Sequence, residues 1–143
     1  MTLRILDTDH VSLFLGGHPQ VIAKLNETGL NWEITVITVQ EIFNGWIGEI
    51  NDPNLSQNPV KLYTKLWTST EFFKFATILN FDATAYDRYQ QLLREQPELN
   101  KKRLVKDMRI AAIALVTGAI VATRNQRDFS LVRNLTLENW VSS

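Results

Sequence analysis

The chain has 143 residues, 45% of them hydrophobic and 21% charged, which suits one folded domain with a core of its own. It contains no cysteine, which excludes disulfides, zinc–thiolate sites and cysteine nucleophiles. The formal net charge is zero, but residues 1–60 carry two basic and seven acidic side chains, whereas residues 101–143 carry eight basic and three acidic ones. If the two ends fold together, the acidic end could form a cation site beside a basic surface that attracts phosphate. The alternative is that both charged segments are ordinary solvent-exposed faces.

The chain shows no secretory or membrane signal. The first ten residues, MTLRILDTDH, lack the apolar segment of a leader peptide. The longest apolar stretch, residues 110–122, is shorter than the roughly 20 residues that a membrane helix needs. We therefore expect a cytoplasmic protein without a membrane segment.

The first third of the chain alternates short strand-like and helix-like segments. Residues 2–6 are apolar and predict a strand that ends directly before Asp7. The pattern then predicts a helix over residues 11–15 capped by Thr8 or Asp9, a helix over residues 19–28 that begins at Pro19, a strand over residues 34–37, and a helix from Thr38 to about residue 50.

The alternation continues after a turn-rich segment at residues 51–59. The pattern predicts a helix over residues 60–73, a weak strand over 77–79, a helix over 82–96 capped by Asp82, an amphipathic helix over 101–117 with Gly118 as its C-cap, a strand over 119–123, a short turn or helix around Asp128, and an edge strand over 135–137. Strands that alternate with helices imply an α/β fold with a parallel sheet covered on both faces, here as one domain over residues 1–143. In such sheets, functional groups gather outside the carboxyl ends of the strands.

Three acidic residues stand where such a sheet edge would collect them. Asp7 follows the first strand directly, and burying it there costs desolvation unless a cation compensates. Glu41 has apolar neighbours near the start of its helix, and Asp107 begins the apolar half of the helix in KDMRIAAIAL. Each also has a purely structural interpretation: a helix N-cap for Asp7, a capping-box residue three positions after Thr38 for Glu41, and a surface ion-pair residue for Asp107.

Polar residues after the strand at 119–123 add to this set. Asn125 can bind a metal through its amide oxygen or hold a bound water, and Arg124 and Arg127 can reach phosphates; the alternative is an ordinary polar loop. Magnesium and manganese prefer carboxylate oxygen and water. Two or three carboxylates around such an ion suit the hydrolysis of a phosphodiester, because the ion lowers the pKa of a bound water and offsets charge on the phosphate.

Five segments in order, ILDTDHVSLF, ITVQEIFNG, KDMRIAAIAL, IVATRNQRDF and LTLENW, resemble the signature blocks of PIN domains, in particular the VapC-type toxins of bacterial toxin–antitoxin pairs. The resemblance runs from Leu3 to Trp140. It implies a three-layer α/β/α sandwich with a mainly parallel sheet, and an endoribonuclease that uses Mg²⁺ or Mn²⁺. It also implies a homodimer and a cognate antitoxin that enters the active-site groove.

The resemblance assigns roles to individual residues. Asp7, Glu41 and Asp107 match the family's catalytic, metal-binding acids, and Asn125 stands where an Asp is common, which puts a fully occupied second metal position in doubt. The supporting residues around these ligands would be Thr8, Asp9, Thr123 and Asp128, with Arg124 and Arg127 on the RNA backbone. We expect His10 and His18 to be turn or capping residues, and Trp32, Trp46, Trp67 and Trp140 to lie in the core or a dimer interface.

Three other interpretations remain open from the sequence. The segment from Ile5 to Asp9 also resembles the start of haloacid-dehalogenase-type phosphatases, but no downstream lysine and acidic pair follow in the required places. A phospho-receiver domain would need a lysine after a late strand, where this chain has Arg124 and Asn125. A PIN-like module that binds RNA or protein without cleaving it is the third, and Asn125 is the residue that suggests it.

Overall fold

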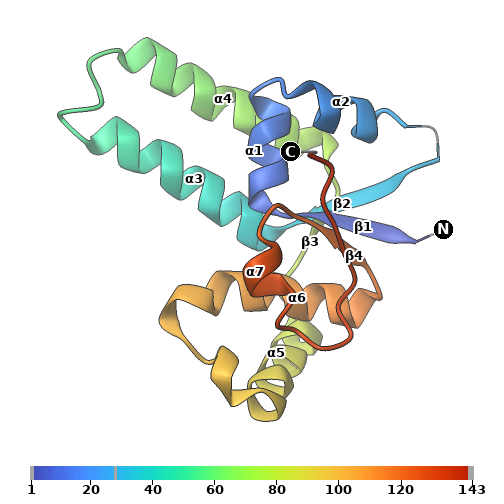
Figure 1. Cartoon of the computed structure of the whole chain (residues 1–143). Coiled ribbons are helices and arrows are strands. Elements are labelled where there is room, and N and C mark those ends of the chain that lie inside the picture. The colour runs from blue at the N-terminus through green and yellow to red at the C-terminus, as the bar shows by residue number, and fades with distance from the viewer. Residues whose placement is uncertain (1, 28, 142–143) are drawn as a thin grey trace.

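The computed structural model describes residues 2–27 and 29–141, and its centre is a parallel sheet of five strands in the order β3-β2-β1-β4-β5 (Figure 1). The strands are β1 (Leu3–Leu6), β2 (Asn31–Thr35), β3 (Ile78–Leu79), β4 (Ile120–Ala122) and β5 (Leu137–Glu138). Every neighbouring pair is parallel, with Ile5 opposite Glu33 on one side and Val121 on the other. The predicted parallel α/β sheet is therefore confirmed.

Helices cover both faces of this sheet. Figure 1 shows α1 (Thr8–Leu15), α2 (Pro19–Leu25), α3 (Val36–Asn51) and α4 (Pro59–Phe75) on one side, and α5 (Ala83–Glu95) and α6 (Val105–Thr117) on the other. Two 3₁₀ turns, η1 (Pro97–Leu99) and η2 (Lys102–Leu104), join α5 to α6, and α7 (Gln126–Phe129) follows β4. The arrangement is the three-layer sandwich that the resemblance implies.

Alternation along the strands explains the two layers of core. Ile5 packs with residues of α5 and α6, such as Leu92 and Met108. Its neighbour Leu6 packs on the opposite face with residues of α1 and α2, such as Val11. Successive strand side chains point to opposite faces, so one short apolar strand stabilises both layers.

Two helices begin earlier than the sequence predicts. Helix α1 starts at Thr8 with Asp7 as its N-cap, whereas Thr8 or Asp9 was expected to cap a helix from residue 11. Helix α3 starts at Val36 and is capped by Thr35, whose Oγ1 accepts from Thr38 N at 3.3 Å. The predicted strand over residues 34–37 is thus wrong in its second half: β-branched Val36 favours a strand locally, but packing of α3 on the core overrides that preference.

The remaining boundaries shift by a few residues. Helix α2 ends at Leu25, and Thr28, the predicted end, lies outside the described residues. Residues 102–104 form η2 ahead of α6, and the last strand lies at Leu137–Glu138. The caps predicted at Asp82 and Gly118 are confirmed, with Gly118 at φ 70°. In the described part of the chain, no helix has the length and apolar character to cross a membrane.

The topology brings three strand ends to one edge. Strand β1 lies between β2 and β4, and Asp7 N continues the pairing by donating to Ala122 O at 2.9 Å. The chain leaves β1 toward β2 and returns much later to β4 on its other side, which makes this edge a topological switch point. Asp7, the start of α3 and the residues after β4 therefore meet here.

Candidate active site

Asp7 is a buried carboxylate without a cationic partner. Its side chain is 5% exposed, Thr8 N donates to Oδ1 at 2.8 Å, and Thr123 Oγ1 donates to Oδ2 at 2.8 Å. In residues 2–27 and 29–141, no Lys or Arg forms an ion pair with it. Burial, followed by repulsion from Asp9 and then from Asp107, raises the pKa of Asp7 to about 7. A bound cation would remove this penalty.

Glu41 reaches the same edge from α3. Thr8 Oγ1 donates to Glu41 Oε1 at 2.7 Å and lies 3.0 Å from Thr38 Oγ1. The alternative role of Glu41, a capping-box residue paired with Thr38, is not what the structure shows: α3 is capped by Thr35, and the Glu41 carboxylate accepts from Thr8 at the start of α1. Thr8 therefore connects the two acids, with its backbone N–H donating to Asp7 and its hydroxyl to Glu41.

Asp107 enters from the other layer, at the first turn of α6. Burial, then repulsion from Glu41 and Asp128, raises the pKa of Asp107 to about 6, although a hydrogen bond from Asn125 opposes the rise. The Asn125 amide nitrogen donates to Asp107 Oδ2 at 3.0 Å and to Asp128 Oδ2 at 3.2 Å. Its amide oxygen accepts from Asp128 N at 3.4 Å as the cap of α7. Asn125 thus presents its nitrogen to Asp107, not the oxygen that a metal ligand would need.

Asp128 differs from the other acids because arginines neutralise it. It is 4% exposed and lies 3.1 Å from Arg103 Nη1 and 3.3 Å from Arg127 Nε. Burial alone raises the pKa of Asp128, but hydrogen bonds from Arg127, Asn125 and Arg103 together lower it to about 2. A carboxylate already paired in this way is a weaker candidate ligand than Asp7 or Asp107.

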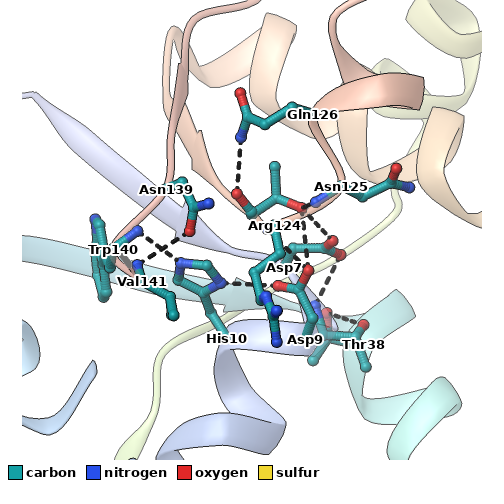
Figure 2. Close-up of polar contacts among 12 residues, drawn as sticks. Asp7, Asp9, His10, Thr38, Arg124, Asn125, Gln126, Asn139, Trp140 and Val141 are labelled. Atoms are coloured by element: carbon teal, nitrogen blue, oxygen red, sulfur yellow. Dashed lines mark hydrogen bonds and ion pairs between the residues drawn. The ribbon is translucent and has the colours of Figure 1, made fainter. Parts of the chain in front are cut away.

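Asp9 links the cluster to the C-terminal segment (Figure 2). Its Oδ2 accepts from Arg124 N at 2.9 Å, and its Oδ1 lies 2.8 Å from His10 Nδ1. His10 is fully buried, and its Nε2 accepts from Trp140 N at 3.1 Å. Because Nε2 is an acceptor, the neutral ring carries its proton on Nδ1 and donates to Asp9. The expectation that His10 is a turn or capping residue is wrong. The His10 ring connects Trp140 to Asp9, and Asp9 in turn binds the backbone N–H of Arg124 in the loop after β4.

The donor set fits a hard divalent cation, although the side chains are not yet gathered around one point. Across residues 2–27 and 29–141, no group of three or more acidic, His or Cys side chains is already placed to hold a metal ion. Asp107 nevertheless repels Asp7, and Glu41 repels Asp107. The oxygens of these carboxylates are the ligands that Mg²⁺ and Mn²⁺ prefer. These three residues are the ones that could hold such an ion.

The family model of the PIN domain matches residues 4–135, which is most of the chain. The chain belongs to the PIN-domain family. This membership decides against the phosphatase and phospho-receiver alternatives.

Known proteins match the chain nearly end to end. Ribonuclease VapC2 of Haemophilus influenzae strain Rd is 25% identical over 138 residues, which cover 96% of this chain and 97% of that protein. The solved structure of VapBC-1 from nontypeable Haemophilus influenzae is 19% identical with a TM-score of 0.75, over 99% of this chain and 100% of that chain. DNA-bound VapBC2 from Rickettsia felis is 23% identical with a TM-score of 0.72, over 98% and 100%. The structural matches support the same fold.

The fold of this PIN domain brings together most of the residues singled out in the sequence. Hydrogen bonds connect Asp7, Thr8, Asp9, Glu41, Asp107, Thr123, Asn125 and Asp128 directly or through one another. Arg124 lies exposed beside them, whereas Arg127 is tied to Asp128. The sequence did not point to Arg103 or to the contact between His10 and Trp140. The residues of each contact lie far apart in the chain, and no local motif marks them.

Outside this cluster, the other aromatic and histidine residues fall in different environments. Trp140 is buried, Trp32 stacks on Phe72, and Trp67 is 61% exposed. His18 occupies the N-cap position of α2 as expected, but its side chain makes no capping hydrogen bond.

The buried His10 link leads to a stability prediction. His10→Phe keeps an aromatic ring but leaves Trp140 N without an acceptor and removes the donor to Asp9 Oδ1, so we expect a loss of about 2–4 kcal/mol in the free energy of unfolding. Urea denaturation measures it. His18→Phe is the matched control, with an expected change under about 1 kcal/mol. Equal effects of the two substitutions would show that the link contributes little.

Proposed function

We propose that this PIN-domain protein is a metal-dependent endoribonuclease and the toxin of a toxin–antitoxin pair. The observation that carries the proposal is the meeting of Asp7, Glu41 and Asp107 at one sheet edge, where none of the described Lys and Arg residues forms an ion pair with them. The name Ribonuclease VapC2 of a relative that matches nearly the whole chain supports the activity. We propose Mg²⁺ as the ion, with Mn²⁺ as the substitute.

Each residue of the cluster has a different role in the proposed hydrolysis. When bound, the cation supplies a water of lowered pKa and positive charge beside the scissile phosphate. Asp7 and Asp107 would hold the ion, and Glu41, positioned by Thr8, would orient the attacking water. Asn125 fixes Asp107 in place, while Thr123 fixes Asp7. Water adds across the P–O bond: its oxygen bonds to phosphorus and a proton goes to the departing sugar oxygen.

Cationic side chains beside the cluster would hold the RNA backbone. The Arg124 backbone is anchored by Asp9, and its exposed guanidinium forms no ion pair with any other described residue. It is therefore free to bind phosphate. Arg127 is also exposed but shares its charge with Asp128, so we assign it the weaker contact.

A protein partner fits the exposed apolar surface of α4. Val60, Tyr63 and Trp67 are 75%, 57% and 61% exposed and line a shallow hollow. One solved structure of similar fold, with a TM-score of 0.69 over 98% of this chain, is a toxin–antitoxin complex from Klebsiella pneumoniae. We propose a cognate antitoxin as a partner of this chain and a homodimer as its own assembly.

The second candidate is a PIN domain that binds RNA or protein without cleaving it. Asn125, which presents an amide nitrogen where the family resemblance expects a carboxylate, favours this candidate. Purified protein, shown to be folded and free of antitoxin, separates the two candidates when incubated with total cellular RNA and Mg²⁺, Mn²⁺ or chelator. The nuclease proposal expects cleavage with metal and none with chelator. RNA binding without cleavage under any metal condition would favour the second candidate.

A further inference from the structure

A cavity of about 520 Å³ adjoins the carboxylate cluster and is lined by residues of α1, α3 and α4. These three helices lie on the same side of the sheet (Figure 1). Thr8 and Glu41 belong to both the cluster and the cavity wall, and the 2.7 Å hydrogen bond between them forms part of the boundary. Sites for small organic groups are of roughly 300–1,000 Å³. A group bound in this cavity would therefore lie directly beside the bond that the carboxylates act on.

The wall combines an immobilised aromatic ring with apolar surface. Trp46 Nε1 donates to Ser69 Oγ at 3.1 Å, and Ser69 Oγ donates to Lys65 O at 2.9 Å, so α4 holds the indole in place. Leu15 and Ile42 add apolar lining. A fixed indole among aliphatic side chains is suited to a flat heterocycle, because stacking on a rigid ring costs little conformational entropy.

The charges of the wall favour a base over a phosphate. Glu41 and Glu49 both line the cavity, and Lys65 is the one basic side chain of the described lining. A carboxylate that holds no cation, such as Glu49, repels a phosphodiester but accepts hydrogen bonds from the amino groups of a nucleobase. Lys65 Nζ, 5.7 Å from the Trp46 ring centroid, adds a donor for a carbonyl or ring nitrogen. Neither Glu49 nor Lys65 forms an ion pair with another described residue.

We propose that this cavity receives one unstacked nucleobase of the RNA next to the cleaved bond, and that Trp46, Glu49 and Lys65 set the base preference. The inference rests on the proposed nuclease function. Single-stranded RNA is generally recognised by splayed bases that stack on aromatic side chains and expose their edges to hydrogen bonds. Bases with an exocyclic amino group, above all guanine, can donate hydrogen bonds from that group to the carboxylates of the wall, whereas uracil has no such amino group.

Two glycines of α3 provide a matched test. A Cβ added at Gly45 or at Gly48 meets nothing within 4 Å, so a side chain can begin at both positions without a clash, but only Gly45 lines the cavity. Gly45→Leu would fill the cavity, and Gly48→Leu is its control. Glu49→Gln keeps the shape of the wall and removes one acceptor charge, which provides a second, milder variant. Each substitution is made in the wild type and in Asp7→Asn, where binding is measured without cleavage.

The readouts are cleavage-site sequencing of a randomised RNA pool and the affinity of short RNAs for the Asp7→Asn forms. We expect Gly45→Leu to lower RNA affinity about tenfold and erase the base preference at one position beside the cut. Gly48→Leu should behave as wild type, and Glu49→Gln should weaken discrimination against uracil.

Equal affinity and preference in Gly45→Leu and Gly48→Leu would overturn the inference, as would a Gly45→Leu variant that loses only the binding of a protein partner. If the wild type binds RNA through the cavity but cleaves none, the base site is supported and the nuclease proposal fails.

Discussion

Asp7→Asn is expected to lower RNA cleavage by about a thousandfold or more while the protein becomes more stable. The loss follows because the amide lacks the negative charge that holds a cation at the site. Cleavage of a defined RNA with Mg²⁺ or Mn²⁺ measures this effect. A loss of activity accompanied by a gain of stability cannot be explained by unfolding.

The gain in stability follows from the pKa of Asp7. Burial raises it from 3.8 to about 7, so the folded protein binds this proton more tightly than the unfolded chain does. The stability that the protonated form contributes is complete below the unfolded pKa and is lost as pH rises through about 7. At pH 8 the metal-free wild type carries the full penalty, which Asn avoids, so we expect about 2–4 kcal/mol of extra stability in the variant and almost none at pH 4.

Asp82→Asn is the control for this substitution. Asp82 caps α5 away from the cluster, and Asn is an equally good cap, so neither activity nor stability should change. Near-normal cleavage by Asp7→Asn would show that Asp7 is not part of the catalytic site. Destabilisation of that variant at pH 8 would contradict the buried, uncompensated carboxylate.

The second large effect is a pH-dependent stabilisation by divalent metal. Burial is the main cause that raises the pKa of Asp7 from 3.8 to about 7 and that of Asp107 from 3.8 to about 6. The metal-free protein should therefore lose stability as pH rises from about 4 to about 7, and be less stable at pH 8 than at pH 5. Metal binds the deprotonated carboxylates. At about 100 times its dissociation constant at pH 8, Mn²⁺ should add ~2.7 kcal/mol, roughly 10 °C in Tm for a chain of this size.

Thermal unfolding at the two pH values, with and without metal, measures this coupling. At pH 5 the carboxyls keep most of their protons, so the same Mn²⁺ concentration should raise Tm only slightly. Chelator should reverse the effect, and monovalent salt of equal ionic strength should not reproduce it. An equal rise in Tm at both pH values would place the metal elsewhere on the protein.

The parts of the fold that the sequence predicts are those encoded by local patterns. Alternating apolar strands and amphipathic helices were enough for the parallel sheet and its two helical layers. Asp7 was recognisable because it directly follows a short apolar strand, and Gly118 because it ends a long periodic helix. Strand order then brings residues after β1 and β4 together, since parallel strands end at the same edge.

Details that depend on packing were not predictable from the sequence. The start of α3 at Val36 reflects burial of the helix on the core, which overrides the strand preference of β-branched residues. The neutralisation of Asp128 by Arg103 joins residues 25 positions apart, and the His10–Trp140 contact joins residues 130 positions apart. The direction of the Asn125 amide depends on two carboxylates and a helix end that only the fold assembles.

Calorimetric titration with Mn²⁺ tests most directly whether these carboxylates form a metal site. Wild type, Asp7→Asn, Asp107→Asn and the control Asp82→Asn are compared at pH 8 in protein freed of metal. We predict saturable binding to wild type and Asp82→Asn, and affinities at least about tenfold weaker for Asp7→Asn and Asp107→Asn. Equal binding by all four proteins, or no binding by wild type, would contradict the assignment of Asp7 and Asp107 as ligands.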